Sequence, residues 1–352
     1  MPHAVPCKPL GCAGSLARVV GVNESNPTDR PAAHRPLLSL FAYIAIVMLC
    51  GAMLAPALHA FGQWVLSSTG GPDMAGKGTW GWLTSEIVKA PYSRYFTRSS
   101  QIFAVLLLWP LVKVAGIHRG LLPEWRPYRS GFGQWVLGLV LAAGLLLAMG
   151  WAFVSAGAYR LRPGADWWAV GPAISAALGA GILEELFFRG AVLGILLTTL
   201  RRWTAVFWCT FFFAAVHFLR APDGWTLPED QTGIFSGFAV LGAILKGFAN
   251  ADFLIAEFST LFAVGWVLAW ARLRTGRLWL SIGLHGGWVF GLKYFSAITS
   301  SSKAMRAGEW LPWIGQNLKI GLVPFVVVSL TGILVIALHS AISRPEGKIS
   351  CQ

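Results

Sequence analysis

The stretch Gly181-Ile-Leu-Glu-Glu-Leu-Phe-Phe-Arg189 decides how this chain is interpreted, because it places three ionisable side chains inside the apolar run 168–198. As a helix, a run of this length can cross the ~30 Å hydrocarbon core of a bilayer. Each charge at the bilayer centre costs about 2.5–3.5 kcal/mol on the insertion scale. We therefore expect Glu184, Glu185 and Arg189 to have partners inside the protein.

The spacing of these residues predicts how they are used. Glu185 and Arg189 are four residues apart, so they share a helix face and can form an ion pair. Glu184 lies about 100° further round the helix and can point elsewhere. Small residues precede both carboxylates at four-residue spacing, which allows neighbouring helices to approach closely: Ala173, Ala177 and Gly181 before Glu185, and Ala176 and Ala180 before Glu184. Both carboxylates should therefore face the interior of a helix bundle.

Composition agrees with a membrane protein. Of 352 residues, 55% are hydrophobic and only 12% are charged, against about 25% charged residues in an ordinary soluble domain. This hydrophobicity excludes a disordered chain, and five cysteines are too few for a disulfide scaffold. Those cysteines also lack the paired spacing of a metal site. The sequence predicts a polytopic membrane protein.

The apolar runs predict an all-α, polytopic membrane helix bundle of about eight transmembrane helices, since isolated strands cannot span lipid. The expected spans are 37–60, 101–117, 132–157, 168–198, 203–219, 253–271, 278–296 and 319–341. The shorter run 233–247 is interpreted as re-entrant or interfacial. In the resulting organisation, 1–36 is a polar cytoplasmic segment without a cleavable signal, 37–160 holds the N-terminal helices, 168–296 forms a core and 319–341 is the last helix.

The excess of basic residues indicates how the chain is oriented in the membrane. The formal net charge is +13, but the basic residues lie mostly between apolar runs and form no soluble basic module. We therefore expect no nucleic-acid partner. Under the positive-inside rule, the distribution favours both termini in the cytoplasm of a multi-pass protein, which we assign to a bacterial inner membrane.

Two histidines and one further carboxylate accompany the glutamates. His217 ends Thr210-Phe-Phe-Phe-Ala-Ala-Val-His217, and His285 lies in Leu280-Ser-Ile-Gly-Leu-His-Gly-Gly-Trp288. Gly283, Gly286 and Gly287 should permit close helix contact around His285. Glu257 is a weaker member of the group. Carboxylates and imidazoles from three helices can activate a water by general-base chemistry, or can bind Zn²⁺ with one open position. Both arrangements predict hydrolysis of a bond within the membrane.

These motifs resemble the CPBP family, the CAAX prenyl protease and bacteriocin-processing proteins, also called Abi. The resemblance rests on Glu184-Glu185-x-x-x-Arg189, on Phe213-x-x-x-His217, and on His285 within 274–288, and it covers roughly 168–296. It implies an intramembrane endopeptidase in which Glu184 or Glu185 activates the attacking water. His217 and His285 would bind and polarise that water, and Arg189 would be the structural partner of the glutamates.

The resemblance leaves two mechanisms open. In a metal-dependent enzyme, Glu184, His217 and His285 would hold Zn²⁺, whereas a glutamic-type enzyme would need no cofactor. The implied substrate is a membrane-embedded or lipid-anchored protein or peptide. One position departs from the family pattern, because Val289 stands where members usually carry Asn, one turn after the last motif histidine.

Two other functions fit parts of the sequence. An ion-coupled transporter would use Glu184, Glu185, Arg189 and Glu257 as an ion path, but such folds favour internal repeats, and none is visible. A catalytically inactive partner protein is the other alternative, and Val289 is the residue that favours it.

Overall fold

The computed structural model describes residues 36–70, 81–114, 129–165, 167–222, 224–228, 231–247 and 251–342. Its regular structure is almost entirely helical, which confirms the predicted all-α class. The long helices are α2 (Pro36–Ser68), α4 (Tyr92–Val114), α5 (Arg129–Ser155), α6 (Val170–Glu185), α8 (Arg202–Val216), α9 (Ser236–Gly247), α10 (Ala251–Thr275), α11 (Trp279–Ile298) and α13 (Leu322–Ile342). The predicted segment before Pro36 lies outside the described residues.

Shorter elements connect these helices. They are α3 (Gly81–Val88), the 3₁₀ turn η4 (Trp167–Ala169), the π-helix η5 (Leu186–Val192), α7 (Leu193–Leu197), α12 (Lys303–Arg306) and the strands β1 (Tyr159–Leu161) and β2 (Thr299–Ser301). Each predicted span overlaps a helix, or, for 168–198, the continuous run of α6, η5 and α7, with ends that differ by several residues in places. The strands were not predicted.

The number of membrane crossings stays a prediction. Within the described residues, two helical stretches are both long and apolar enough to cross a membrane, Pro36–Ser68 and Gly131–Ser155. The apolar helices Arg202–Val216, Ser236–Gly247 and Leu322–Val335 are shorter. Length and composition therefore support two spans, and the eight-span topology and its orientation are not confirmed.

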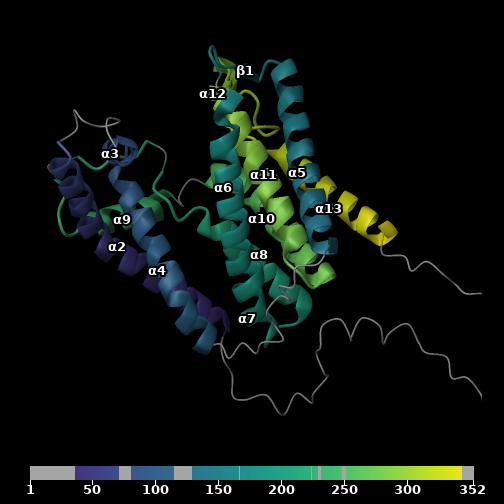
Figure 1. Ribbon diagram of the computed structural model, residues 1–352, viewed down its shortest axis with the longest axis horizontal. Coiled ribbons are helices and arrows are strands. Elements are labelled where there is room, and N and C mark those ends of the chain that lie inside the picture. Colours follow the sequence, from purple (N-terminus) through teal and green to yellow (C-terminus); the bar gives the residue numbers. More distant parts are fainter. Residues whose placement is uncertain are drawn as a thin grey trace, which may run out of the picture.

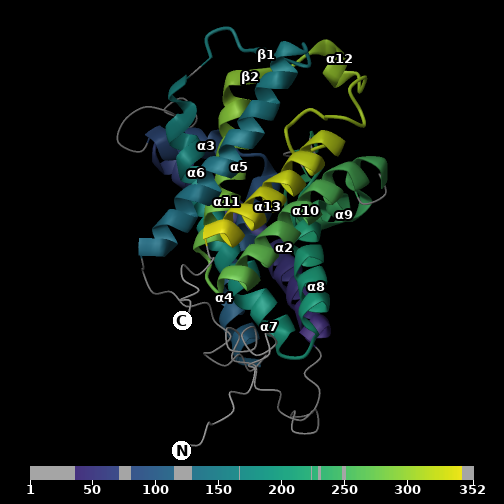
Figure 2. The same cartoon turned by 90° about the vertical axis from the view of Figure 1, so that its right-hand side faces the viewer.

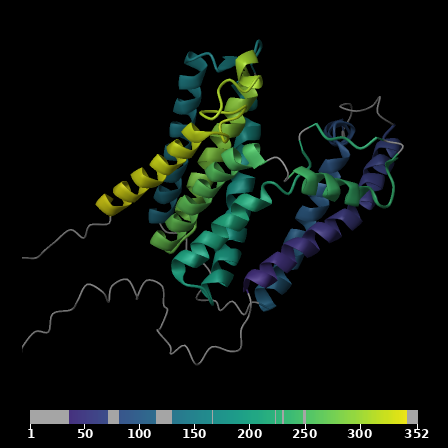
Figure 3. The same cartoon turned by 180° about the vertical axis from the view of Figure 1, so that it is seen from behind.

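The helices form two groups. Figure 1 shows α2, α3, α4 and α9 on one side and the bundle of α5, α6, α10, α11 and α13 on the other, and Figure 3 shows the same division from behind. One buried apolar cluster joins the groups, with Leu40 and Tyr43 from α2 packed among Phe188 and Val192 from η5. The first helix group thus covers the helical run that carries the two glutamates.

Helix α11 lies at the centre of the second group and packs against α5 and α6. Glycines make this packing possible. A Cβ added at Gly287 would lie 2.6 Å from the carbonyl oxygen of Leu139 in α5. One added at Gly181 in α6 would lie 3.3 Å from Cα of Gly286. The close helix contacts predicted around His285 are therefore present, and they hold that residue against α6.

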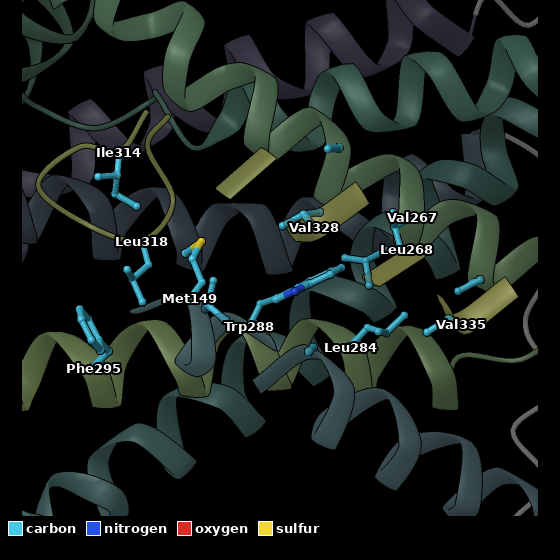
Figure 4. Packing of buried hydrophobic residues seen from close by; sticks show 14 of the residues in the cluster. Met149, Val267, Leu268, Leu284, Trp288, Phe295, Ile314, Leu318, Val328 and Val335 are labelled. Atoms are coloured by element: carbon cyan, nitrogen blue, oxygen red, sulfur yellow. The ribbon is translucent and has the colours of Figure 1, made fainter. Parts of the chain in front are cut away.

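Loops and a short ribbon fix the ends of α11. At its start, α10 ends at Thr275 and Gly276 adopts φ +69, a conformation that favours glycine after a helix. At its other end, β2 pairs antiparallel with β1, with Tyr159 opposite Ser301, and Figure 2 shows this ribbon beside α12. Below the ribbon, Met149, Trp288, Phe295 and Leu318 pack in one buried cluster (Figure 4).

Candidate active site

Glu185 is the most buried carboxylate of the predicted site, with a fully buried side chain. Its Oε1 accepts a hydrogen bond from Nη1 of Arg189 at 2.8 Å and another from Nδ1 of His285 at 2.9 Å. The first contact is the ion pair that the four-residue spacing predicts. The second joins α6 to α11, where the glycine contacts bring the two helices together. Glu185 is thus held by two charge-assisted bonds.

Arg189 is buried and contacts three helices of the protein. It is 1% exposed, and its Nη2 donates to the carbonyl oxygen of Gly265 in α10 at 3.2 Å. The guanidinium also lies over the Phe213 ring, 4.4 Å from the ring centroid, a favourable cation–π contact. These contacts link α6, α8 and α10 through one side chain.

Both histidines use Nδ1 for a contact inside the protein, which leaves Nε2 facing the site. Nδ1 of His217 lies 2.7 Å from the carbonyl oxygen of Phe213, and Nδ1 of His285 lies 2.9 Å from the Glu185 carboxylate. Because these oxygens only accept hydrogen bonds, each Nδ1 carries a proton. In the neutral form of each ring, Nε2 is then the unprotonated nitrogen, and it lies toward Glu184.

Glu184 lies close to the Nε2 atoms of both His217 and His285. Its Oε2 is 3.7 Å from Nε2 of His285 and 3.9 Å from Nε2 of His217. That oxygen is buried and has no hydrogen-bond partner. A carboxylate oxygen and two nitrogen lone pairs need a proton donor or a cation between them, and the separations leave room for a water hydrogen-bonded to the carboxylate and to a ring nitrogen.

The two glutamates have different environments, which the sequence could not distinguish. The Glu184 side chain is 35% exposed, whereas that of Glu185 is 0% exposed. Glu184 faces a cavity of about 330 Å³ lined also by His217 and by apolar residues of α2, α4, η5 and α8, among them Ile44, Val47 and Phe188. Only Glu184 of the two lines this cavity.

The helix that carries the glutamates changes its winding directly after them. Residues Leu186–Val192 form a π-helix, and Phe188 through Val192 are all buried. A single π turn inside an α-helix is a feature often found at functional sites. Here it lets neighbouring side chains, Phe188 and Arg189, both point inward. The apolar pattern of 168–198 predicts a helix and carries no sign of this turn.

The candidate metal ligands lie further apart than the ligands of a bound zinc ion. In the described part of the chain, no three His, Cys, Asp or Glu side chains form a group that could hold a metal. Ligand atoms about 2.0–2.1 Å from a tetrahedral Zn²⁺ would lie about 3.3–3.5 Å apart, and the Glu184–histidine separations of 3.7 and 3.9 Å are wider. The donor types suit zinc, whereas the separations exceed those of a closed tetrahedral site.

Two predicted positions lie apart from this group. Glu257 pairs with Lys319 and does not join Glu184, Glu185 and the histidines. Val289 follows His285 by one turn of α11 and supplies no polar group. Sequence reasoning did not predict the pairing with Lys319, because the position of this residue at the edge of the predicted span 319–341 resembles that of an ordinary interfacial lysine.

Comparison with known proteins gives one match. Residues 166–291 match the family model described as "Type II CAAX prenyl endopeptidase Rce1-like". This region holds Glu184, Glu185, Arg189, His217 and His285, and the match confirms the resemblance found from the motifs. No curated protein and no solved structure matches the chain.

Proposed function

We propose that this chain, whose residues 166–291 match the type II CAAX prenyl endopeptidase Rce1-like family model, is a membrane endopeptidase that uses Glu184 to activate a water. The observation that carries the proposal is the convergence of Glu184 Oε2 with the Nε2 atoms of His217 and His285 at the wall of an apolar cavity. A general base has to reach its water, and Glu184 is the one of the two carboxylates that lines the cavity.

The reaction follows from these positions. A water between Glu184 and the histidines is oriented by their lone pairs. Glu184 takes one of its protons, and the water oxygen attacks the carbonyl carbon of the scissile peptide bond. When the tetrahedral intermediate collapses, the carbon–nitrogen bond breaks and Glu184 returns the proton to the leaving amine. Glu185 takes no part in proton transfer, because its hydrogen bonds to Arg189 and His285 serve to orient the His285 ring.

The cavity favours an apolar, membrane-associated substrate. Its walls are mostly aliphatic and aromatic, with few polar groups such as Gln101 and Thr97 at α4. Burying apolar surface there contributes about 25 cal/mol per Å². We infer a membrane-embedded or lipid-anchored protein or peptide as substrate, and a CAAX-type prenylated peptide is the first to test.

Zinc is the alternative occupant of the same position. Glu184, His217 and His285 would hold it, and it would then supply Lewis-acid activation of the water. Metal analysis of the purified protein, combined with activity after 1,10-phenanthroline treatment, separates the two versions. We expect less than one zinc per chain and undiminished cleavage. Stoichiometric zinc with activity lost on chelation would replace the glutamate mechanism by the metal one.

The proposed function is tested by cleavage of a farnesylated CAAX peptide in detergent, with the released tripeptide detected by mass spectrometry. Glu184→Gln keeps the shape of the side chain but cannot take the proton, so we expect no release above background. Glu309→Gln, at an exposed position, is the matched control and should cleave like the parent.

Proteomics extends the test to natural substrates. Membrane proteins cleaved in cells with the parent protein but not in Glu184→Gln cells would be its substrates. Equal cleavage by the parent and by Glu184→Gln, in the peptide assay and in cells, would exclude this function. A biological role that survives in Glu184→Gln cells would favour the inactive partner protein, for which Val289 argues, and flux through liposomes would favour the transporter.

A further inference from the structure

A glutamine on α4 lines the cavity and has no role in the mechanism described above. Gln101 contributes to the cavity wall together with Glu184 of α6 and His217 at the end of α8. It is the last polar residue of α4 before the apolar stretch 102–112. Polar groups are few in such a cavity, and in ligand pockets they usually fix the orientation of the ligand. The position of Gln101 therefore calls for an explanation.

A hydrogen bond from Arg98 fixes the orientation of the Gln101 amide. Nη1 of Arg98 lies 2.9 Å from Oε1 of Gln101, almost one turn away on the same helix. Because a guanidinium only donates hydrogen bonds, the Gln101 atom that faces it is the oxygen and not the nitrogen. Nε2 and its two hydrogens are then left for another acceptor, and no residue of the described ranges accepts from them.

The hydroxyl groups of the cavity wall are not available to a substrate. Tyr43 and Thr97 each donate their hydroxyl hydrogen to a backbone carbonyl. The Ser100 hydroxyl is buried against the neighbouring helix α2 (Figure 1), where a Cβ added at Gly51 would collide with it. Among the side chains that line the cavity, Gln101 is thus the one with a hydrogen-bond donor left for a bound molecule.

A peptide bound in this cavity needs such a donor. The attacking water has to reach the scissile carbonyl, so the chain around that bond cannot lie in a regular helix. In apolar surroundings, a backbone carbonyl without an intrahelical partner is costly unless another donor binds it. An extended chain advances about 3.3–3.6 Å per residue, so a cavity of about 330 Å³ holds only a few residues. A carbonyl beside the scissile bond therefore lies in the cavity that Gln101 lines.

We propose that Gln101, oriented by Arg98, binds the substrate main chain by donating a hydrogen bond from Nε2 to a carbonyl beside the scissile bond. This inference rests on the proposed function. Gln101 is a substrate-binding residue, and Arg98 is a positioning residue that acts through it. The hydrogen bond forms on binding and persists through the reaction, so it lowers KM and leaves kcat nearly unchanged.

Steady-state kinetics with the farnesylated CAAX peptide test the role of the amide. A neutral hydrogen bond contributes about threefold to tenfold, so Gln101→Leu should raise KM by that factor, with kcat changed less than about twofold. Gln63→Leu is the matched control and should leave KM unchanged. Gln63 is also exposed and also contacts a side chain one turn away, His59 of α2, but it does not line the cavity.

A double variant tests whether Arg98 acts through Gln101. Arg98→Met frees the amide to rotate and should raise KM by a smaller factor than Gln101→Leu. In the Gln101→Leu background the same change should add nothing, because the effects of residues that share one contact are not additive. Arg94→Met, at an exposed arginine of α4 that pairs with Glu86, is the control and should leave KM unchanged. Additive effects of Arg98→Met and Gln101→Leu would overturn the positioning role of Arg98.

Changes in the substrate separate recognition from a structural role. Each amide next to the scissile bond is replaced in turn by an (E)-alkene, which keeps the planar, extended shape and removes the carbonyl. At one position this replacement should raise KM of the parent by about threefold to tenfold and should raise KM of Gln101→Leu no further. A glutamine that only supports the fold would give the same ratio between parent and variant with every peptide.

The outcomes distinguish this inference from the proposed function. Parental KM in a folded Gln101→Leu protein would overturn the assignment of Gln101 and leave the endopeptidase intact, provided that Glu184→Gln is inactive. Equal effects of every alkene peptide on the parent and on Gln101→Leu would overturn it as well. Full activity of Glu184→Gln would instead refute the proposed function itself.

Discussion

Nδ1 of His285 lies 2.9 Å from Oε1 of Glu185, although the two residues are 100 positions apart in the chain. This bond fixes the ring so that Nε2 faces Glu184. Since Arg189 binds the same carboxylate oxygen, one buried group connects the structural ion pair to the histidine that contacts the cavity-facing glutamate. The two adjacent glutamates thus have different surroundings, in line with the proposal that Glu185 positions His285 and Glu184 transfers the proton.

Neutralising Glu185 should destabilise the fold. Glu185→Gln leaves the buried Arg189 without a counter-charge, and breaking a buried pair by removing one partner costs about 3–5 kcal/mol. We expect a clear drop in the thermal unfolding midpoint in detergent, larger than for Glu184→Gln, whose side chain is partly exposed. Equal midpoints for the two variants would contradict the assignment of Glu185 as the structural carboxylate.

Replacing either histidine by asparagine should remove activity while preserving the fold. The asparagine amide can take the place of Nδ1 and donate to Glu185 or to the Phe213 carbonyl, but it has no atom in the place of Nε2. We expect kcat for both His285→Asn and His217→Asn to fall by about 10²-fold or more, in the range of general acid–base contributions. Activity near that of His59→Asn, the control on α2, would show that Nε2 is not needed.

The contact between α5 and α11 should not tolerate a methyl group at Gly287. The added Cβ would lie 2.6 Å from the Leu139 carbonyl oxygen, so the helices must separate, at a cost of about 1–3 kcal/mol for overpacking. Gly179→Ala in α6, where a Cβ meets nothing within 4 Å, is the control and should stabilise the helix slightly. Thermal unfolding of both variants measures the difference. A Gly287→Ala protein as stable as the control would refute this packing.

Filling the cavity should impair substrate binding. Val47 lines it from α2, and Val47→Trp would occupy volume that the substrate needs. We expect KM for the farnesylated peptide to rise at least about tenfold, with a smaller change in kcat. Val140→Trp, at an exposed position of α5, should leave KM unchanged. An unchanged KM in a folded Val47→Trp protein would exclude this cavity as the binding site.

Helix positions were largely predictable, and their ends were less so. The apolar runs marked the helices because a buried or lipid-facing helix needs consecutive apolar residues. Helix α4 begins at Tyr92 and not at 101, however, because helical hydrogen bonds continue through polar residues such as Arg94, which pairs with Glu86 of α3. The β1–β2 ribbon escaped prediction, since pairing between distant three-residue strands leaves no local pattern.

The sequence by itself determined the local features of this protein: the helical runs, the Glu185–Arg189 pair and the small residues that allow close packing. These depend on spacings of a few residues along one helix, which the 3.6-residue repeat fixes. Only the tertiary structure decided which glutamate faces the cavity and which ring nitrogen each histidine turns toward Glu184. Those relationships join residues of different helices, and a residue's helical face does not specify the atom it meets on a neighbouring helix.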